Sequence, residues 1–229
     1  LRQSPQASER LRRERGLRDP LVLGLGIAHG GLAPAAVQGL RAHGLSSQRI
    51  TEALTDAGVF SRRTGNYRLG RRLLIPAIAN GETIYYQARS LDSDGAFKYL
   101  NPPDLPRPLF GIETLARDNQ LVWIGEGPFD VLPLIEAGQS AVAGMGSDIT
   151  REATVALAAA IGPREAIVIF DNDRAGLTKG AELADNLRKH GCQVAIMPPP
   201  DGVKDYGEWA ARDGVAHVIA DVCWSLPPR

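Results

Sequence analysis

From residue 121 onward, short apolar runs alternate with helical segments, and this alternation restricts the fold more than any other feature of the chain. The apolar runs are LVWIG (121–125), SAVAG (140–144), EAIVIF (165–170) and CQVAIMP (192–198). The segments between them have the length expected of helices, about 10–15 residues. Strands that alternate with such helices form a mostly parallel sheet flanked by helices. In sheets of this kind ligands bind beyond the carboxyl ends of the strands, so we look there for a site.

Carboxylates follow three of these four strands. Glu126 comes directly after the first strand and Asp130 four residues later. Asp171 and Asp173 follow the third strand, and Asp205 lies beyond the fourth. Because the strands are expected to end at one edge of the sheet, we predict that these side chains gather there. Taken singly, Asp173 could instead cap the next helix, and Asp130 could favour a helix N-terminus through the dipole.

The composition of this group indicates a hard cation. The carboxylates would repel one another if nothing neutralised them, and a bound cation relieves that repulsion. No His or Cys stands among them, and oxygen ligands suit Mg²⁺ or Mn²⁺. Two such ions can activate a hydroxyl and stabilise a leaving oxygen in phosphoryl transfer. We therefore expect a site for two or more Mg²⁺ or Mn²⁺ ions and no zinc.

The N-terminal half has a different pattern. Segments 7–18, 34–43 and 46–57 read as helices, and the stretch after residue 67 reads as two strands joined by the turn Asn80-Gly81. We predict an α/β protein with an N-terminal α+β subdomain (1–116), a parallel-sheet subdomain (117–200) and a short acidic loop with a helical tail (201–229).

Charge is divided unevenly along a chain whose formal net charge is zero. Residues 1–101 contain 15 Lys and Arg against 8 Asp and Glu, and residues 102–229 contain 11 against 18. A basic half of this kind indicates a polyanionic partner such as nucleic acid, although two ordinary surfaces would give the same totals.

Several classes of protein are excluded by composition. The 2 cysteines, Cys192 and Cys223, form no CxxC pair, which argues against a zinc finger or a disulfide scaffold. No apolar run approaches the roughly 18 residues of a membrane span, and the first residues do not resemble a signal peptide. We expect a cytoplasmic protein without a membrane partner. Because the chain begins at Leu1, we also expect a fragment of a longer protein.

Two motifs at the strand ends resemble the signatures of the Toprim domain, which bacterial-type primases, topoisomerases and some nucleases share. They are EGPFD (126–130) and DNDRAG (171–176). GMGS (144–147) and VKDYGEW (203–209) resemble two further primase motifs. The last of these departs from the family pattern, because Gly207 stands where a second Asp is common.

The basic half resembles the polymerase core of bacterial-type DNA primases. The resemblance lies in RERGL (13–17), LGLGIAHG (23–30), RRLLIPAI (71–78), YQARSL (86–91) and FKYLNPP (97–103). It implies a basic ridge that binds single-stranded template. The ridge residues would be Arg15, Arg72, Arg89, Lys98, Tyr99 and Asn101, with Arg107 as the nearest candidate for one further cation. Such cations neutralise phosphates without reading sequence, and Tyr99 could stack on a base.

The resemblance further implies template-directed synthesis of short RNA primers from ribonucleoside triphosphates on single-stranded DNA, by a nucleotidyltransferase. Glu126, Asp171 and Asp173 would be the catalytic metal ligands, with Asp130 and Asp205 as ligands or supporting groups. Arg174 and Lys204 would contact the nucleotide. A replicative helicase would bind through regions outside this chain. The short central region would also suit a phage, plasmid or mobile-element primase, or a primase-helicase.

Three alternatives remain at this point. A Toprim nuclease would use the same metals to cut nucleic acid, and the basic motifs argue against it. A phosphatase of the haloacid dehalogenase type would explain IVIFDND but leave EGPFD (126–130) without a role. A non-catalytic module that binds single-stranded DNA would keep binding after Asp171→Ala, with no activity to lose.

Overall fold

The structure, a computed structural model, describes residues 5–20, 23–28, 32–91, 97–146 and 149–226. Contacts divide the chain into two compact units whose segments interleave along the sequence. The parallel-sheet unit consists of Leu1–Leu23, Ala77–Thr83 and Arg107–Arg229. The antiparallel-sheet unit consists of Gly24–Pro76 and Ile84–Pro106. The subdomain boundaries at residues 116 and 200 come from the sequence alone and stay a prediction.

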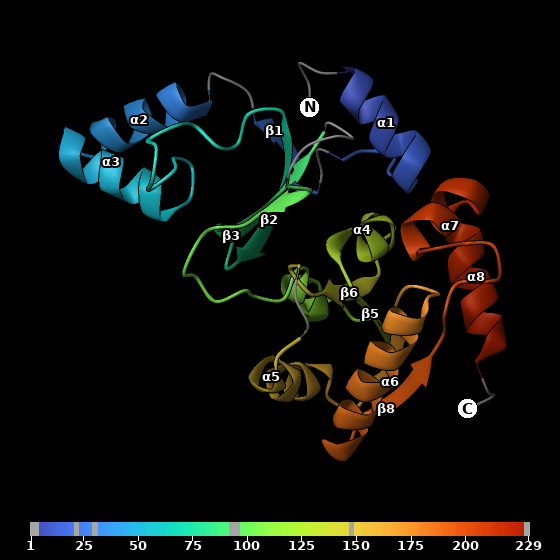
Figure 1. The fold of residues 1–229 in the computed structure, drawn as a ribbon. Coiled ribbons are helices and arrows are strands. Elements are labelled where there is room, and N and C mark those ends of the chain that lie inside the picture. The colour runs from blue at the N-terminus through green and yellow to red at the C-terminus, as the bar shows by residue number, and fades with distance from the viewer. Residues whose placement is uncertain (1–4, 21–22, 29–31, 92–96, 147–148, 227–229) are drawn as a thin grey trace. The chain divides into compact units, whose positions relative to one another are not determined.

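The parallel-sheet unit contains the alternating strands and helices predicted after residue 121 (Figure 1). Its elements are α1 (Pro5–Arg15), η1 (Ile112–Ala116), β5 (Leu121–Gly125), α4 (Pro128–Glu136), β6 (Ser140–Ala143), α5 (Arg151–Ile161), β7 (Glu165–Ile169), α6 (Arg174–Lys189), β8 (Gln193–Ile196), α7 (Tyr206–Asp213) and α8 (Val215–Ser225). The four strands form a parallel sheet in the order β6-β5-β7-β8. The predicted fold class is therefore confirmed.

Helices cover both faces of this sheet, as the apolar sequence of its strands requires. On one face, Val122, Ile124 and Val168 belong to a buried cluster with Leu157 of α5 and Leu187 of α6. The opposite face carries alternate strand residues, and helices α4 and α7 pack there. The ring of Trp123 contacts Tyr206 of α7 edge-on, with 6.5 Å between ring centroids. The two central strands β5 and β7 are thereby held with their carboxyl ends side by side.

The antiparallel-sheet unit contains most of the predicted hairpin, whose turn and adjoining strand ends (77–83) are counted with the parallel-sheet unit. Its elements are β1 (Gly26–Ala28), α2 (Leu32–Ala42), α3 (Ser47–Asp56), β2 (Arg72–Ala79), β3 (Glu82–Ser90) and β4 (Tyr99–Leu100). The sheet order is β1-β2-β3-β4. At the turn between β2 and β3, Asn80 and Gly81 have φ values of 53° and 79°, the positive values that a two-residue hairpin turn favours. Side chains of α3, with Leu69 and Ala88, form the core of this unit.

Within the described residues, we find no helix with the length and hydropathy that a membrane crossing requires.

Candidate functional site

Glu126 stands at the carboxyl end of β5, where the chain turns sharply into α4. Gly125 allows that turn, because a Cβ atom there would lie 2.8 Å from Val131 Cγ1. The Glu126 carboxylate accepts a hydrogen bond from the Lys179 ammonium of α6 at 3.3 Å. Both side chains are about a third exposed or more, 35% for Glu126 and 41% for Lys179. The pair is therefore open to water and to exchange with another cation.

Asp130 lies in the first turn of α4 and is buried. Its Oδ2 accepts a hydrogen bond from the Gly127 backbone N–H at 2.8 Å, which closes the start of the helix. Burial raises the pKa of Asp130 to about 8, and the charges of Asp171 and Asp205 act in the same direction. Asp130 therefore stabilises the N-terminus of α4 by a hydrogen bond to the backbone, where the sequence offered an interaction with the helix dipole as the alternative role. The same carboxylate is also electrostatically coupled to the two other acidic groups.

Asp171 and Asp173 follow β7 as predicted, but they have different partners. Asp173 is the N-cap of α6, and its Oδ1 accepts from the Gly176 backbone N–H at 2.8 Å. Asp171 Oδ2 accepts from the Lys204 ammonium at 2.7 Å. The intervening Asn172 ties its loop to the segment before α7, since its N–H donates to the Lys204 carbonyl at 3.0 Å. Backbone and side chain thus hold Lys204 against Asp171.

Asp205 is the N-cap of α7 and accepts from the Glu208 backbone N–H at 2.7 Å. It also accepts from Arg15 Nη1 at 3.1 Å and 3.0 Å, through its two oxygens. The Arg15 guanidinium lies 5.1 Å from the centroid of the Phe129 ring. Arg15 belongs to the parallel-sheet unit, and its side chain is only 19% exposed. Its predicted contact with the template remains a prediction.

Three of the predicted carboxylates share one electrostatic environment. The pKa of Lys204 is raised, first by its hydrogen bond to Asp171 and further by the charges of Asp205 and Asp130. Among the residues that the structure describes, no three His, Cys, Asp or Glu side chains are close enough to hold one metal ion together. Each of these carboxylates instead accepts a hydrogen bond from a backbone N–H group or from one of the cations Lys179, Lys204 and Arg15.

The donor set nevertheless fits a hard divalent cation chemically. Its members are carboxylate oxygens, and three of them face a protein cation rather than a neutral group. Burial is the main cause of the raised pKa of Asp130, and the charges of Asp171 and Asp205 raise it further. A divalent ion bound at this edge would reduce the repulsion among these carboxylates.

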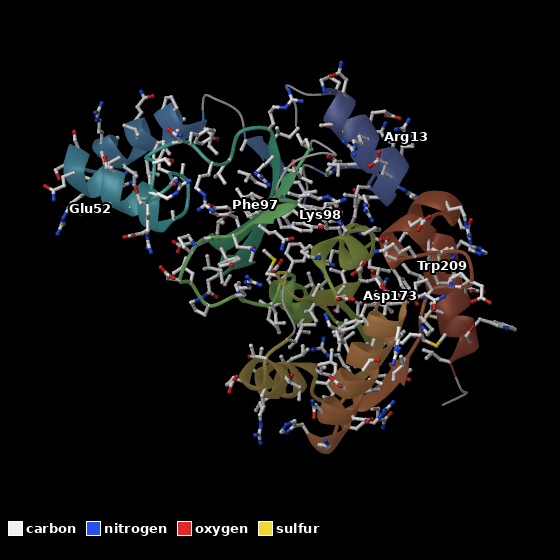
Figure 2. All side chains as sticks on the ribbon, viewed as in Figure 1. Arg13, Glu52, Phe97, Lys98, Asp173 and Trp209 are labelled. Atoms are coloured by element: carbon white, nitrogen blue, oxygen red, sulfur yellow. The ribbon has the colours of Figure 1, made fainter. Side chains whose placement is uncertain are left out.

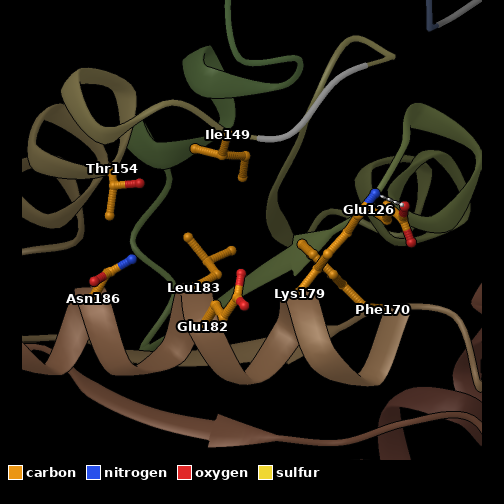
Figure 3. Close-up of a pocket in the computed structure, with 8 residues that line it drawn as sticks. All are labelled: Glu126, Ile149, Thr154, Phe170, Lys179, Glu182, Leu183 and Asn186. Atoms are coloured by element: carbon orange, nitrogen blue, oxygen red, sulfur yellow. Dashed lines mark hydrogen bonds and ion pairs between the residues drawn. The ribbon is translucent and has the colours of Figure 1, made fainter. Parts of the chain in front are cut away.

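A pocket of about 120 Å³ opens beside Glu126 between α5 and α6 (Figure 3). Phe170, Leu183 and Ile149 line its apolar part. The polar residues Lys179, Glu182, Asn186 and Thr154 line the remainder together with Glu126. Sequence reasoning did not identify Lys179. The sequence feature that could have identified Lys179 is its position one turn after Gly176, on the helix that begins within DNDRAG.

The antiparallel-sheet unit holds the other predicted template residues. Arg89 Nη1 donates to the Tyr99 hydroxyl at 3.2 Å, and the two residues are partners across the β3–β4 ladder. Lys98 Nζ lies 5.7 Å from the centroid of the Tyr99 ring. Asn101 Oδ1 is buried and has no hydrogen-bond partner among the described residues. Arg72, Arg89, Lys98, Tyr99 and Asn101 thus lie in one unit, at the strands β2, β3 and β4.

The remaining predicted residues lie as follows. Arg174 is the exposed first residue of α6. Arg107 belongs to the parallel-sheet unit and donates to the Gly146 carbonyl at 2.6 Å. Parts of two motifs, Ser147 of GMGS and His29-Gly30 of LGLGIAHG, lie outside the described residues.

Comparisons with known proteins agree with this geometry. Residues 123–209 match the Toprim-like family. The DNA primase of Synechococcus elongatus is 32% identical, over 92% of this chain and 32% of its own length. The RNA polymerase domain of Mycobacterium tuberculosis primase superimposes with a TM-score of 0.76 at 27% identity, over 94% of this chain and 75% of that one. The catalytic core of Escherichia coli primase gives 0.75 at 25% identity, over 98% and 75%. The chain spans about a third of the length of the curated relatives it matches.

Proposed function

We propose that this chain, a homologue of the bacterial DNA primases with a Toprim-like domain, is a primase polymerase core that synthesises short RNA primers on single-stranded DNA. The single observation that carries the proposal is the gathering of carboxylates and cations at the carboxyl edge of the parallel sheet. Electrostatic interactions there link Asp130, Asp171, Asp205 and Lys204. Phosphoryl transfer depends on positioning and charge neutralisation more than on covalent chemistry, and this edge offers both.

Glu126, Asp171 and Asp173 would hold two or more divalent cations, Mg²⁺ or Mn²⁺, with Asp130 and Asp205 as further ligands or supporting groups. Bound ions of this kind neutralise the triphosphate and favour attack by a hydroxyl. Glu126, whose side chain is 35% exposed, would handle the proton of the attacking group. In the overall reaction the primer 3′-hydroxyl attacks the α-phosphate and pyrophosphate leaves.

Lys204 and Arg174 supply positive charge at the same edge. Lys204 Nζ contacts Asp171 at 2.7 Å, and its side chain is 65% exposed. We infer that Lys204 would bind triphosphate oxygens and that Asp171 would be a ligand of the divalent ion. Arg174, at the start of α6, would contact the same phosphates.

The basic residues of the antiparallel-sheet unit would hold the template. Arg72, Arg89 and Lys98 neutralise phosphates, and Asn101 adds a polar group beside them. A replicative helicase is the partner we expect through regions outside this chain, and a cytoplasmic location remains a prediction from the sequence.

The test is a primer-synthesis assay on mixed-sequence single-stranded DNA, with labelled ribonucleotides and Mg²⁺ or Mn²⁺. Asp171→Ala should abolish product and Arg89→Ala should reduce it. Asp185→Ala, at an exposed aspartate on α6, and Arg41→Ala, on α2, are the matched controls and should retain activity. The same assay with an annealed primer measures elongation separately from initiation.

Two outcomes would overturn the proposal. Metal-dependent shortening of the DNA, lost in Asp171→Ala, would identify a nuclease. Binding of single-stranded DNA without synthesis or elongation, and unchanged by Asp171→Ala, would identify a binding module.

A further inference from the structure

Phe97 is the most exposed phenylalanine among the described residues, with 66% of its surface open to solvent. It stands in the antiparallel-sheet unit directly before Lys98, and Figure 2 labels both residues. A single exposed apolar residue is ordinary on a protein surface. Two further features suggest that Phe97 has a binding role: its backbone is anchored to the sheet, and cationic residues follow it in the chain.

The backbone around Phe97 is anchored to the sheet although its ring is exposed. Arg72 Nη1 donates to the Phe97 carbonyl at 3.0 Å and to the Ala88 carbonyl at 3.4 Å, so one guanidinium clamps this segment to β3. The Ser90 N–H donates to the Lys98 carbonyl at 2.9 Å and extends the β3–β4 pairing toward Phe97. A ring on an anchored backbone loses little conformational entropy when a ligand covers it.

Tyr99, the aromatic residue that the sequence suggested for base stacking, is placed differently. It is half-buried, and its hydroxyl accepts from Arg89. The Arg89 guanidinium carbon and Lys98 Nζ lie 5.6 Å and 5.7 Å from its ring centroid, within the range of cation–π contacts. The Tyr99 ring is therefore engaged with two cations, whereas the ring of Phe97, two residues earlier in the chain, is exposed.

We propose that Phe97 stacks on a base of the single-stranded template, while Tyr99 positions Arg89 and Lys98 for the adjacent phosphates. An aromatic platform next to cations is the general chemistry of single-strand binding, because every base has a π-face and every linkage a negative charge. The inference deepens the proposed function and rests on it.

The experiment compares affinities for a labelled mixed-sequence single-stranded oligonucleotide by fluorescence anisotropy. Phe97→Ala should bind about five- to a hundredfold more weakly, the range found when one base–aromatic stack is removed. Phe97→Trp should bind at least as tightly as the parent chain. Leu105→Ala removes a different exposed apolar side chain, 47% exposed in the same unit, and should leave affinity unchanged.

Two further measurements separate stacking from charge. The slope of log affinity against log salt should be unchanged in Phe97→Ala, whereas Lys98→Ala should lower its magnitude by about 0.7. Removing single bases from the oligonucleotide should reveal a position where the parent chain loses affinity. That loss should vanish in Phe97→Ala and persist in Tyr99→Leu.

The outcomes distinguish the inference from the function beneath it. If the parent chain binds single-stranded DNA and the Phe97→Ala and Leu105→Ala variants bind it with equal affinity, the stacking role of Phe97 is overturned. The proposed function is not affected by that result. The same holds if Phe97→Ala weakens binding to duplex DNA as much as to single strands, because duplex bases are already stacked. Failure of the parent chain to bind single-stranded DNA overturns both the inference and the proposed function.

Discussion

At the scale of single residues, the carboxylates of the candidate site are held in unequal ways. Asp130 is buried and bonded to a backbone N–H group, whereas Glu126 is partly exposed and faces a flexible lysine. An exposed ion pair contributes little to stability and exchanges readily. A buried carboxyl that must stay neutral instead makes stability depend on pH. Asp130 should therefore leave a clear signature in the pH dependence of unfolding.

We expect Asp130→Asn to flatten the pH dependence of stability. The folded pKa of Asp130, about 8, lies above the value near 4 of an unfolded aspartate. Between these values the unfolded chain has released a proton that the folded chain keeps, so the free energy of unfolding falls as pH rises. The loss from this group is about 1.4 kcal/mol per pH unit inside the window. Asparagine cannot ionise and can still accept from Gly127.

Urea unfolding at several pH values from 4 to 8, in EDTA, measures this effect. Asp118→Asn, at an exposed aspartate, is the control and should follow the parent chain. Parallel profiles for Asp130→Asn and the parent would contradict the prediction.

At the scale of elements, close packing of a helix on the preceding loop sets the geometry after β7. A Cβ atom on Gly176 would lie 2.3 Å from the Asp171 carbonyl oxygen. That oxygen belongs to the backbone and cannot move without displacing the Asp171 side chain as well. Gly180, one turn later on α6, has room for a Cβ atom, which would lie 3.4 Å from Val168 Cγ1.

Gly176→Ala should therefore destabilise the chain by at least about 2 kcal/mol, as overpacking does in rigid surroundings. It should also lower primer synthesis, because Asp171 and Asp173 lie in the displaced loop. Gly180→Ala is the matched control. It should be neutral or should stabilise by up to about 1 kcal/mol, since alanine favours helices more than glycine does. Thermal unfolding of the two variants measures the difference, and similar melting temperatures would refute the argument.

At the scale of the whole molecule, the first helix belongs to the same unit as the C-terminal half of the chain. Helix α1 packs against α7, and Arg15 joins Asp205 across 190 positions of sequence. Asp205 also caps α7, so its side chain links the two helices. With the Arg15 and Asp205 side chains only 19% and 11% exposed, removing one partner leaves the other charge poorly solvated.

Arg15→Ala should lower the free energy of unfolding by about 1–3 kcal/mol, because Asp205 loses a charged hydrogen-bond partner. Arg13→Ala, at a side chain that is 77% exposed on the same helix, should change it by less than about 0.5 kcal/mol. Chemical denaturation compares the variants. Unchanged stability with weaker DNA binding in Arg15→Ala would favour the template contact predicted from the sequence over the structural role.

Much of the architecture could be predicted from local patterns in the sequence. The apolar runs predicted four parallel strands, and Asn80-Gly81 predicted the hairpin. The burial of Trp123, Phe170 and Cys192 also follows from their place in or beside these runs. Such features depend on neighbours a few residues apart, so periodicity and turn chemistry reveal them.

Tertiary structure alone decided the long-range ion pairs of the candidate site. Glu126 meets Lys179 53 positions away, Asp171 meets Lys204 33 positions away, and Asp205 meets Arg15 190 positions away. No local pattern specifies such pairs, because they depend on which helices pack together. The sequence shows that Tyr99 is an aromatic residue close to cationic residues, but it does not show what packs against the ring. The structure shows that Arg89 and Lys98 lie over the Tyr99 ring and that the ring of Phe97 is exposed to solvent.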